Sequence, residues 1–164
     1  MKLLIFLLFV GTTTVLIGQP VGIGVSGIYN LQTESIGFGL RGAIYGKRVN
    51  IIPQVAYYPS FNKVHEIFLG IGAEYNAIIE KNVRFYALGH GAFNAWLNHE
   101  NSTKKNAQLS NWAAEVGLGV AGRNCWQPFL EYRYNVKWQE TNLRVGITYI
   151  LRCKSGGYTC PSYL

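Results

Sequence analysis

The sequence has few charged residues and, after residue 18, no long hydrophobic run. Only 14% of its 164 residues are Asp, Glu, Lys or Arg, although 49% are hydrophobic. No apolar run beyond residue 18 reaches the roughly 18 residues of a membrane-spanning helix. The apolar residues must therefore be dispersed along the chain, as they are in strands that have one apolar face.

Acidic residues and cysteines are also few, and this argues against several kinds of site. The chain has 8 acidic against 15 basic residues, a formal net charge of +7. The lysines are scattered over predicted turns and loops and form no basic stripe, so we expect no nucleic-acid partner. The three cysteines have neither C-x-x-C nor zinc-ligand spacing, and we predict no metal site and no cofactor.

The first 18 residues have the features of a secretory signal peptide. The basic Lys2 precedes an apolar stretch, residues 3–10, and a less apolar run follows up to Gly18. We expect cleavage after Gly18, so that the mature chain begins at Gln19.

Eight segments between residues 21 and 151 alternate apolar residues with polar or small ones. This period of two predicts β-strands, and no segment competes with a helical period. Each segment has about 9–14 residues, the length that a tilted strand needs to cross the hydrocarbon of a bilayer. The predicted strands are residues 21–29, 35–45, 49–58, 64–75, 83–96, 111–121, 129–138 and 143–151.

The two faces of these strands differ in kind. One face has bulky apolar residues, and the other is rich in Gly and Ala with nearly balanced charges, which suits the narrow interior of a small barrel better than a solvated surface. We therefore expect the apolar face to contact lipid and the polar face to line a closed lumen. The expected lipid contacts are Ile23, Phe38, Leu40, Ile51, Val55, Leu69, Ile71, Val116, Leu118, Val145 and Ile147. The expected lumen network is Arg41, Glu66, Glu74, Arg84, His90, Glu115, Glu131, Arg133 and Arg144, with Lys137 on the same face.

The ends of the segments and their connections indicate the same arrangement. Aromatic residues at strand ends predict two girdles: Tyr29, Tyr57, Tyr58, Trp96, Trp112 and Trp138 at one rim, and Tyr45, Tyr75, Phe85, Trp126 and Tyr149 at the other. Connections 46–48, 80–82 and 122–128 are short, and those between them are more polar. Such alternation is typical of periplasmic turns and external loops, and an even strand number places both termini on the side of the short turns.

Over essentially the whole mature length, this pattern resembles the small eight-stranded bacterial outer-membrane barrels of the OmpA, OmpX and OmpW type. The predicted fold class is all-β, an eight-stranded antiparallel transmembrane β-barrel over residues 19–151, followed by a periplasmic Cys-containing tail, 152–164. The resemblance implies a closed barrel, filled by side chains, among the lipids of a Gram-negative outer membrane. We expect a monomer. Known roles in that family are envelope integrity, adhesion, passage of small apolar solutes and, in a few members, lipid modification.

Two motif-like patterns have simpler explanations. G-x-G-x-x-G occurs at residues 22–27, 37–42 and 117–122, but no predicted helix follows it, as a dinucleotide site requires. Its first two glycines share the inward face, where we expect them to relieve crowding. Residues 89–95 are loosely similar to the His-x-Ser-Asn-Ala signature of lipid A deacylases, but Ala92 stands at the nucleophile position. We therefore predict no catalytic residue and interpret His90 as a lumen histidine.

The cysteines, Cys125, Cys153 and Cys160, all map to the side of the short turns. An exported location permits disulfides. A Cys153–Cys160 bond would close a small loop in the tail, and a Cys125–Cys153 bond is equally conceivable because the seventh and eighth strands are neighbours. Either pair leaves one thiol over.

These features predict a structural or interaction role: envelope integrity, adhesion, or a subunit of an envelope complex. A protein partner would bind the external loops 30–34, 59–63, 97–110 and 139–142, or the periplasmic tail. One alternative is a narrow channel for small or apolar solutes. The other is a lipid A-modifying barrel enzyme, for which the sequence offers no nucleophile.

Overall fold

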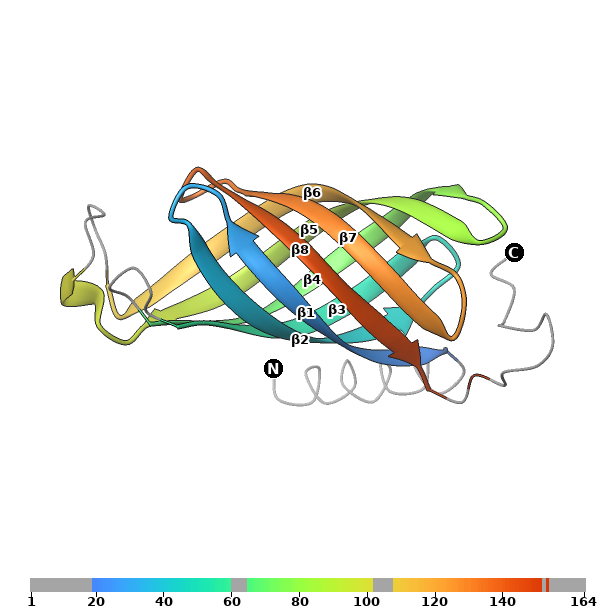
Figure 1. Ribbon diagram of the computed structural model, residues 1–164, viewed down its shortest axis with the longest axis horizontal. Coiled ribbons are helices and arrows are strands. Elements are labelled where there is room, and N and C mark those ends of the chain that lie inside the picture. The colour runs from blue at the N-terminus through green and yellow to red at the C-terminus, as the bar shows by residue number, and fades with distance from the viewer. Residues whose placement is uncertain (1–18, 60–64, 102–107, 152, 154–164) are drawn as a thin grey trace, which may run out of the picture.

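A computed structural model describes residues 19–59, 65–101, 108–151 and 153 (Figure 1). The predicted signal peptide and Cys160 lie outside these residues. The strands are β1 (Val21–Asn30), β2 (Ser35–Tyr45), β3 (Val49–Tyr58), β4 (Glu66–Ile79), β5 (Val83–Trp96), β6 (Ser110–Gly122), β7 (Trp126–Asn135) and β8 (Glu140–Ile150), with a short 3₁₀ helix, η1 (His99–Asn101), after β5. Among the described residues, no helix is long and apolar enough to cross a bilayer.

The strands form one closed antiparallel barrel, which confirms the predicted fold class. Each strand pairs with its neighbours in the sequence, and β8 returns to β1. In this closing ladder, Val25 lies opposite Ile147 and Gly22 lies opposite Ile150. Because the first and last strands pair, no strand edge is left open to lipid. Figure 1 shows the strands crossing the barrel obliquely, with the start of β1 and the end of β8 at the same end.

The connections define two ends of the barrel, which we call the turn end and the loop end. Turns 46–48, 80–82 and 123–125 lie at the turn end, together with the start of β1 and the end of β8. The connections at the loop end are 31–34, 59–65, 97–109 and 136–139. The predicted alternation is confirmed, but the third turn is shorter than expected because Gly122 and Pro128 still belong to the strand ladders.

One departure from the prediction lies at the loop end of β7, which ends at Asn135 rather than at Trp138. The side-chain oxygen of Asn135 accepts hydrogen bonds from the backbone N–H groups of Lys137 and Trp138, both at 3.1 Å. Gln139 completes the turn with a φ of 55°. The prediction that Lys137 lies on the lumen face is therefore wrong, because this residue belongs to a turn, and β8 begins already at Glu140.

β4 also differs from the predicted segment 64–75. It pairs with β5 across an irregularity in register between Asn76 and Ile78. Such a bulge interrupts the alternation, and Ile78 and Ile79 are both exposed, by 54% and 38%. The strand therefore continues past the point where the simple pattern ends.

The predicted assignment of the two faces is confirmed. Along β3, exposed and buried residues alternate at every position. All of the expected lipid contacts are exposed large apolar side chains, and Leu118 is the most exposed of them at 67%. The barrel thus has an apolar belt on its outer wall and places its polar residues inside.

Three aromatic residues that were assigned to the girdles face the lumen instead. Tyr45, Tyr58 and Trp96 are buried, with exposures of 3%, 4% and 4%. Tyr45 lies four residues after Arg41 on β2, and both are buried. The alternation of the strand therefore directs both side chains into the lumen. Trp138 lies in the turn after β7, with its ring centroid 4.9 Å from that of Trp96. The other predicted girdle residues are on the outer wall: Tyr29, Tyr57 and Trp112 near the loop end, and Tyr75, Phe85, Trp126 and Tyr149 near the turn end.

The inward glycines make room for aromatic rings. A Cβ atom on Gly37 would lie 2.7 Å from the ring of Tyr58. A Cβ atom on Gly119 would overlap the ring of Tyr86. Both glycines belong to the G-x-G patterns, and their interpretation as relief from crowding is confirmed.

Candidate functional site

Layers of buried side chains fill the lumen. The loop-end cluster is Ile28, Ala56, Tyr58, Phe68, Ala92 and Ala113. Toward the turn end lie two clusters, one of Ala43, Tyr45, Ile52 and Ile150, and one of Tyr86, Leu88, Ala121 and Phe129. Polar side chains, each less than a tenth exposed, lie between these layers, as Gln54 lies between Ile52 and Ala56 on β3. We call them the lumen network: Arg41, Gln54, Glu74, Arg84, His90, Glu115, Glu131, Arg133, Asn142 and Arg144.

Arg41 joins two carboxylates that come from β4 and β7. Its Nη1 donates to Oε1 of Glu131 at 2.7 Å, and its Nη2 donates to Glu74. Glu74 also accepts a hydrogen bond from Arg84 at 2.8 Å. The hydroxyl of Tyr86 donates to Glu131 at 2.8 Å. These bonds connect β2, β4, β5 and β7 across the lumen.

Glu115 on β6 is the centre of the other half of the network. Its Oε2 accepts hydrogen bonds from Nη1 of Arg133 and from Nδ1 of His90, both at 3.1 Å. Its Oε1 accepts from the side-chain amide of Asn142 at 3.3 Å. The guanidinium of Arg144 lies 3.5 Å from the same carboxylate. Four side chains thus converge on one buried carboxylate.

Arg133 and Gln54 complete the network. Nη2 of Arg133 lies 2.6 Å from Oε2 of Glu131, which joins the two halves. Oε1 of Gln54 accepts from Arg133 at 3.4 Å and from Arg144 at 3.3 Å, so its amide nitrogen faces Nε2 of His90 at 2.7 Å. That ring nitrogen accepts the amide proton, and Nδ1 carries the proton that is donated to the carboxylate on β6. Both ring nitrogens of His90 are therefore engaged.

The carboxylates and the histidine of the lumen network all have charged or hydrogen-bonding partners. Each of the three carboxylates in the network is paired with at least one of its four arginines. Ala92, at the nucleophile position of the deacylase signature, faces the lumen, so His90 has no hydroxyl to activate there. Within the described part of the chain, no group of three or more His, Cys, Asp or Glu side chains could hold a metal ion.

Eight of the nine lumen residues proposed from the sequence lie together in this network. The ninth, Glu66, lies apart near the loop end, where it accepts a hydrogen bond from the indole N–H of Trp96 at 2.5 Å. The prediction omitted Gln54 and Asn142, which connect the charged groups. Gln54 occupies an inward position of the predicted strand 49–58, and its polar side chain there is the signal that would have found it. Asn142 falls in the predicted loop 139–142 and belongs to β8 only in the structure.

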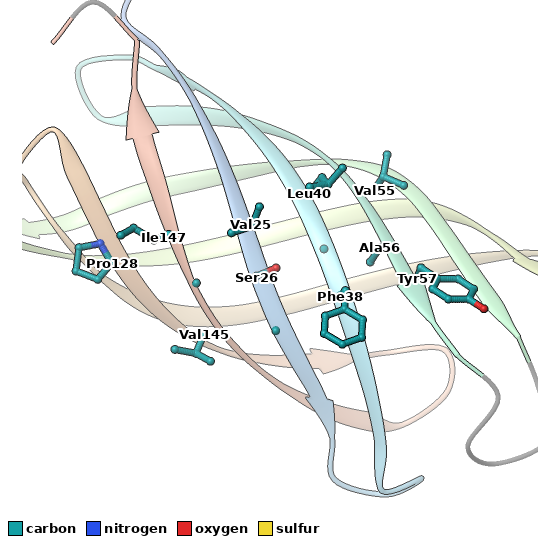
Figure 2. Close-up of a pocket in the computed structure, with 13 residues that line it drawn as sticks. Val25, Ser26, Phe38, Leu40, Val55, Ala56, Tyr57, Pro128, Val145 and Ile147 are labelled. Carbon is teal, nitrogen blue, oxygen red and sulfur yellow. The ribbon is translucent and has the colours of Figure 1, made fainter.

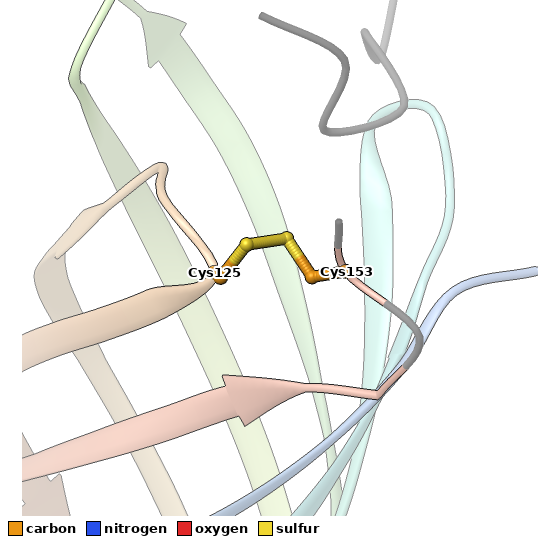
Figure 3. The surroundings of a disulfide bond; sticks show 2 residues. All are labelled: Cys125 and Cys153. Carbon is orange, nitrogen blue, oxygen red and sulfur yellow. A yellow bond between two sulfur atoms is a disulfide. The ribbon is translucent and has the colours of Figure 1, made fainter. Parts of the chain in front are cut away.

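A disulfide fastens the chain after β8 to the neighbouring turn. Cys125 is bonded to Cys153, with Cα atoms 5.6 Å apart (Figure 3). Of the two pairs that the sequence leaves open, the structure has this one, and Cys160 lies outside the described residues. The backbone N–H of Ile150 donates to the carbonyl of Cys125 at 2.9 Å, and Cys153 contacts the buried cluster at the turn end.

The double variant Cys125→Ser, Cys153→Ser is expected to lose about 3 kcal/mol of unfolding free energy, because the bond spans 28 residues and restricts the unfolded chain. Denaturant unfolding of the oxidised proteins in detergent micelles measures this difference. The control, Cys160→Ser, should unfold as the wild type does. A loss caused by Cys160→Ser would instead make Cys160 one of the bonded cysteines.

Shallow apolar hollows on the described outer wall include one of about 820 Å³ and one of about 650 Å³, which extend from β7 and β8 over β1 and β2 to β3 and β4. Figure 2 shows the larger one, which is lined by side chains that include Val25, Phe38 and Val145. Gly27 leaves open space there, since nothing lies within 4 Å of a Cβ placed on it. Neither hollow has the converging polar groups of a small-molecule site, and acyl chains are the partner that such a surface fits.

Solved structures with the same architecture include natural outer-membrane proteins. The N-terminal β-barrel domain of OprF from Pseudomonas aeruginosa matches with a TM-score of 0.59 and 14% identity, over 80% of this chain and 97% of that one. Ail from Yersinia pestis, in a phospholipid bilayer nanodisc, matches with a TM-score of 0.53 and 12% identity, over 81% and 99%. The outer membrane enzyme PagL matches with a TM-score of 0.53 and 7% identity, over 79% and 97%. No protein-family model and no curated protein sequence matches the chain.

These similarities concern the fold, which an enzyme such as PagL shares with the other two proteins. A shared fold does not select an activity, so the function has to be argued from the lumen and the two ends of the barrel. The closed sheet, the apolar belt and the polar lumen agree with these neighbours. The chain has the fold of the small eight-stranded transmembrane β-barrels of the bacterial outer membrane.

Proposed function

We propose that this protein is a monomeric, non-enzymatic barrel of the outer membrane that reinforces the envelope or presents its ends to an envelope partner. The observation that supports this most is the lumen network. Ion pairs and hydrogen bonds connect β2 through β8 inside the barrel, with apolar clusters on both sides of them. Such an interior favours a closed scaffold over a channel.

The outer wall supports the location in a membrane. Leu40, Leu69 and Val145 are exposed by 63%, 60% and 63%, although each is a large apolar side chain. In water the belt would be one continuous exposed apolar surface, whereas in a bilayer it contacts acyl chains. Trp112 near the loop end and Trp126 near the turn end are also exposed, as rings at membrane interfaces are.

The loop end supports a role in contacts outside the membrane. Nζ of Lys137 lies 4.9 Å from the ring centroid of Trp112 and 4.5 Å from that of Trp138. A cation held against two rings is an ordered surface feature. We propose that an envelope partner would bind around this cluster or to the periplasmic tail.

The structure changes the extent of the predicted loops. The predicted loops 30–34 and 139–142 include residues that belong to strands, because Asn30 ends β1 and Glu140 begins β8. Most of the predicted loop 59–63 lies outside the described residues. The described surface at the loop end therefore comes mainly from connections 31–34 and 136–139 and from the described parts of 97–109.

Membrane fractionation followed by electrophoresis of unboiled and boiled samples tests this location. We expect the protein in the outer-membrane fraction, and we expect the unboiled form to migrate differently because the barrel stays folded in detergent. Recovery of the folded protein in the soluble periplasmic fraction would contradict the proposal.

Two further measurements separate the alternatives. Planar-bilayer recordings of the purified wild type should show no stable conductance steps, and stable steps would favour a narrow channel. Mass spectra of lipid A should be identical with and without the protein. A mass change that disappears in a His90→Ala variant would instead establish a lipid-modifying enzyme.

A further inference from the structure

The turn end of the barrel is strongly basic. Turns 46–48, 80–82 and 123–125 contain the cations Lys47, Arg48, Lys81 and Arg123 and the single anion Glu80, which is four positive charges against one negative charge. Lys47, Arg48 and Lys81 are exposed, and Arg123 is half-buried. The four loop-end connections contain Lys63, Lys104, Lys105 and Lys137 against Glu34 and Glu100, four positive charges against two negative charges. The turn end thus concentrates a net charge of +3 in three short turns, whereas the longer loop-end connections together have +2.

The strand ends hold these cations close to the apolar belt. Each turn has three residues, so its side chains start directly beside the last strand residues. Nη1 of Arg48 donates to the hydroxyl of Tyr75 at 3.3 Å, and Tyr75 is 47% exposed on the outer wall. The backbone N–H of Arg123 donates to the carbonyl of Asn82 at 3.0 Å, and its guanidinium donates to the carbonyl of Glu80. These contacts order two of the turns next to each other.

Aromatic residues mark the level at which these cations lie. Tyr75, Phe85 and Trp126 are exposed on the outer wall by 47%, 47% and 58%, and all three are near the turn end. Amphipathic rings prefer the depth of the lipid head groups. The basic side chains follow immediately beyond these rings, which is the depth of the lipid phosphates.

We propose that the turn end binds the head groups of anionic phospholipids in the adjacent leaflet. This inference rests on the membrane location proposed above. Guanidinium and ammonium groups bind phosphate oxygens through charge-assisted hydrogen bonds. The cations come from three separate turns around the rim and do not converge on one pocket, which fits a layer of head groups better than one soluble anion. Short turns also keep the charges at the membrane surface, away from a partner that lies deeper in the periplasm.

Spin-labelled lipids measure whether the barrel prefers anionic phospholipids to zwitterionic ones as neighbours. The full chain is reconstituted in phosphatidylcholine vesicles, and the association of labelled phosphatidylglycerol is compared with that of labelled phosphatidylcholine. We expect the wild type to favour phosphatidylglycerol by about fivefold for each cation engaged at low salt. Added sodium chloride should reduce this preference by screening, and a preference that is insensitive to salt would contradict the electrostatic account.

Two matched variants assign the preference to one end of the barrel. The variant Lys47→Gln, Arg48→Gln, Lys81→Gln, Arg123→Gln should lose it. The control Lys63→Gln, Lys104→Gln, Lys105→Gln, Lys137→Gln removes the same number of cations from the other end and should keep it. Heat-modifiable migration of both variants shows that their barrels are folded. The inference is overturned if the turn-end variant keeps the preference or if the loop-end control loses it.

Two other outcomes are decisive as well. Incorporation of the wild type without any lipid preference overturns this inference alone, whereas a chain that stays in solution overturns the membrane location and this inference with it. Co-sedimentation with peptidoglycan that needs the four turn-end cations, in the absence of a lipid preference, would assign the surface to the wall polymer.

Discussion

Glu115→Gln is expected to lower the free energy of unfolding by about 3–5 kcal/mol, as removal of one partner from a buried ion pair does. The carboxylate of Glu115 is fully buried and accepts hydrogen bonds from Arg133, His90 and Asn142, with Arg144 close by. The amide keeps the shape of the side chain but removes its charge. Two buried guanidinium groups then lose a counter-charge that water cannot replace. Urea unfolding of the barrel in lipid vesicles measures the difference.

Two further variants make this prediction specific. Glu100→Gln changes an exposed carboxylate at the loop end and should shift stability by less than about 0.5 kcal/mol. The double variant Glu115→Gln, Arg144→Gln removes one cation together with the anion, and coupling between neighbours should recover about 1 kcal/mol of the loss. A Glu115→Gln variant as stable as the wild type would mean that this carboxylate does not hold the lumen together.

Leu118→Arg is expected to destabilise the membrane-inserted barrel by about 2–4 kcal/mol, the cost of a cation on the lipid face near the bilayer midplane. Leu118 is 67% exposed on the outer wall, near the middle of the outward positions of β6 between Trp112 and Gly122. Acyl chains offer the guanidinium neither hydrogen bonds nor a counter-charge. Unfolding in lipid vesicles measures the loss.

The control for this second prediction places the same charge at a different depth in the bilayer. Val49→Arg places the same charge on the lipid face at the start of β3, directly beside turn 46–48. Near the interface the cost should fall to about 0–1 kcal/mol, because the side chain reaches head groups and water. Equal losses at Leu118 and Val49 would show that the wall does not cross the hydrocarbon as proposed.

The two predictions test the two faces of the barrel sheet, the lumen face and the outer wall. The wall requires an apolar surface because lipid surrounds it, and the lumen requires paired charges because it is nearly closed to water. In a soluble protein, most apolar side chains are buried and most charged ones are exposed, and both requirements reverse this distribution. The lumen network contains four arginines against three carboxylates, so the loss of any one carboxylate leaves an even larger excess of positive charge.

Alternation alone predicts some of the strands to the residue. β2, β3 and β5 have the predicted bounds, because their alternation is uninterrupted and their turns begin where it ends. The predicted strand 129–138 lies three residues too far along the chain compared with β7, because apolar residues continue to alternate up to Trp138. The hydrogen bonds of Asn135 close a turn there, and such side-chain contacts outweigh a pattern of hydropathy. Tyr45 was misplaced for the opposite reason, since its position near a strand end suggested a girdle while the alternation placed it inside.

The sequence by itself determined the number of strands, the face that most strand residues present and the transmembrane character of the wall. It could do so because a period of two is a local property, and every strand of a closed sheet with a lipid-facing side obeys it. Only the tertiary structure decided which lumen charges pair, that Gln54 connects them, and that Cys125 rather than Cys160 bonds to Cys153. The bonds of Arg41 alone join residues 33 and 90 positions away. Contacts between residues so far apart in the sequence depend on the register of every ladder and on the closure of β1 against β8. No local pattern of the sequence predicts them.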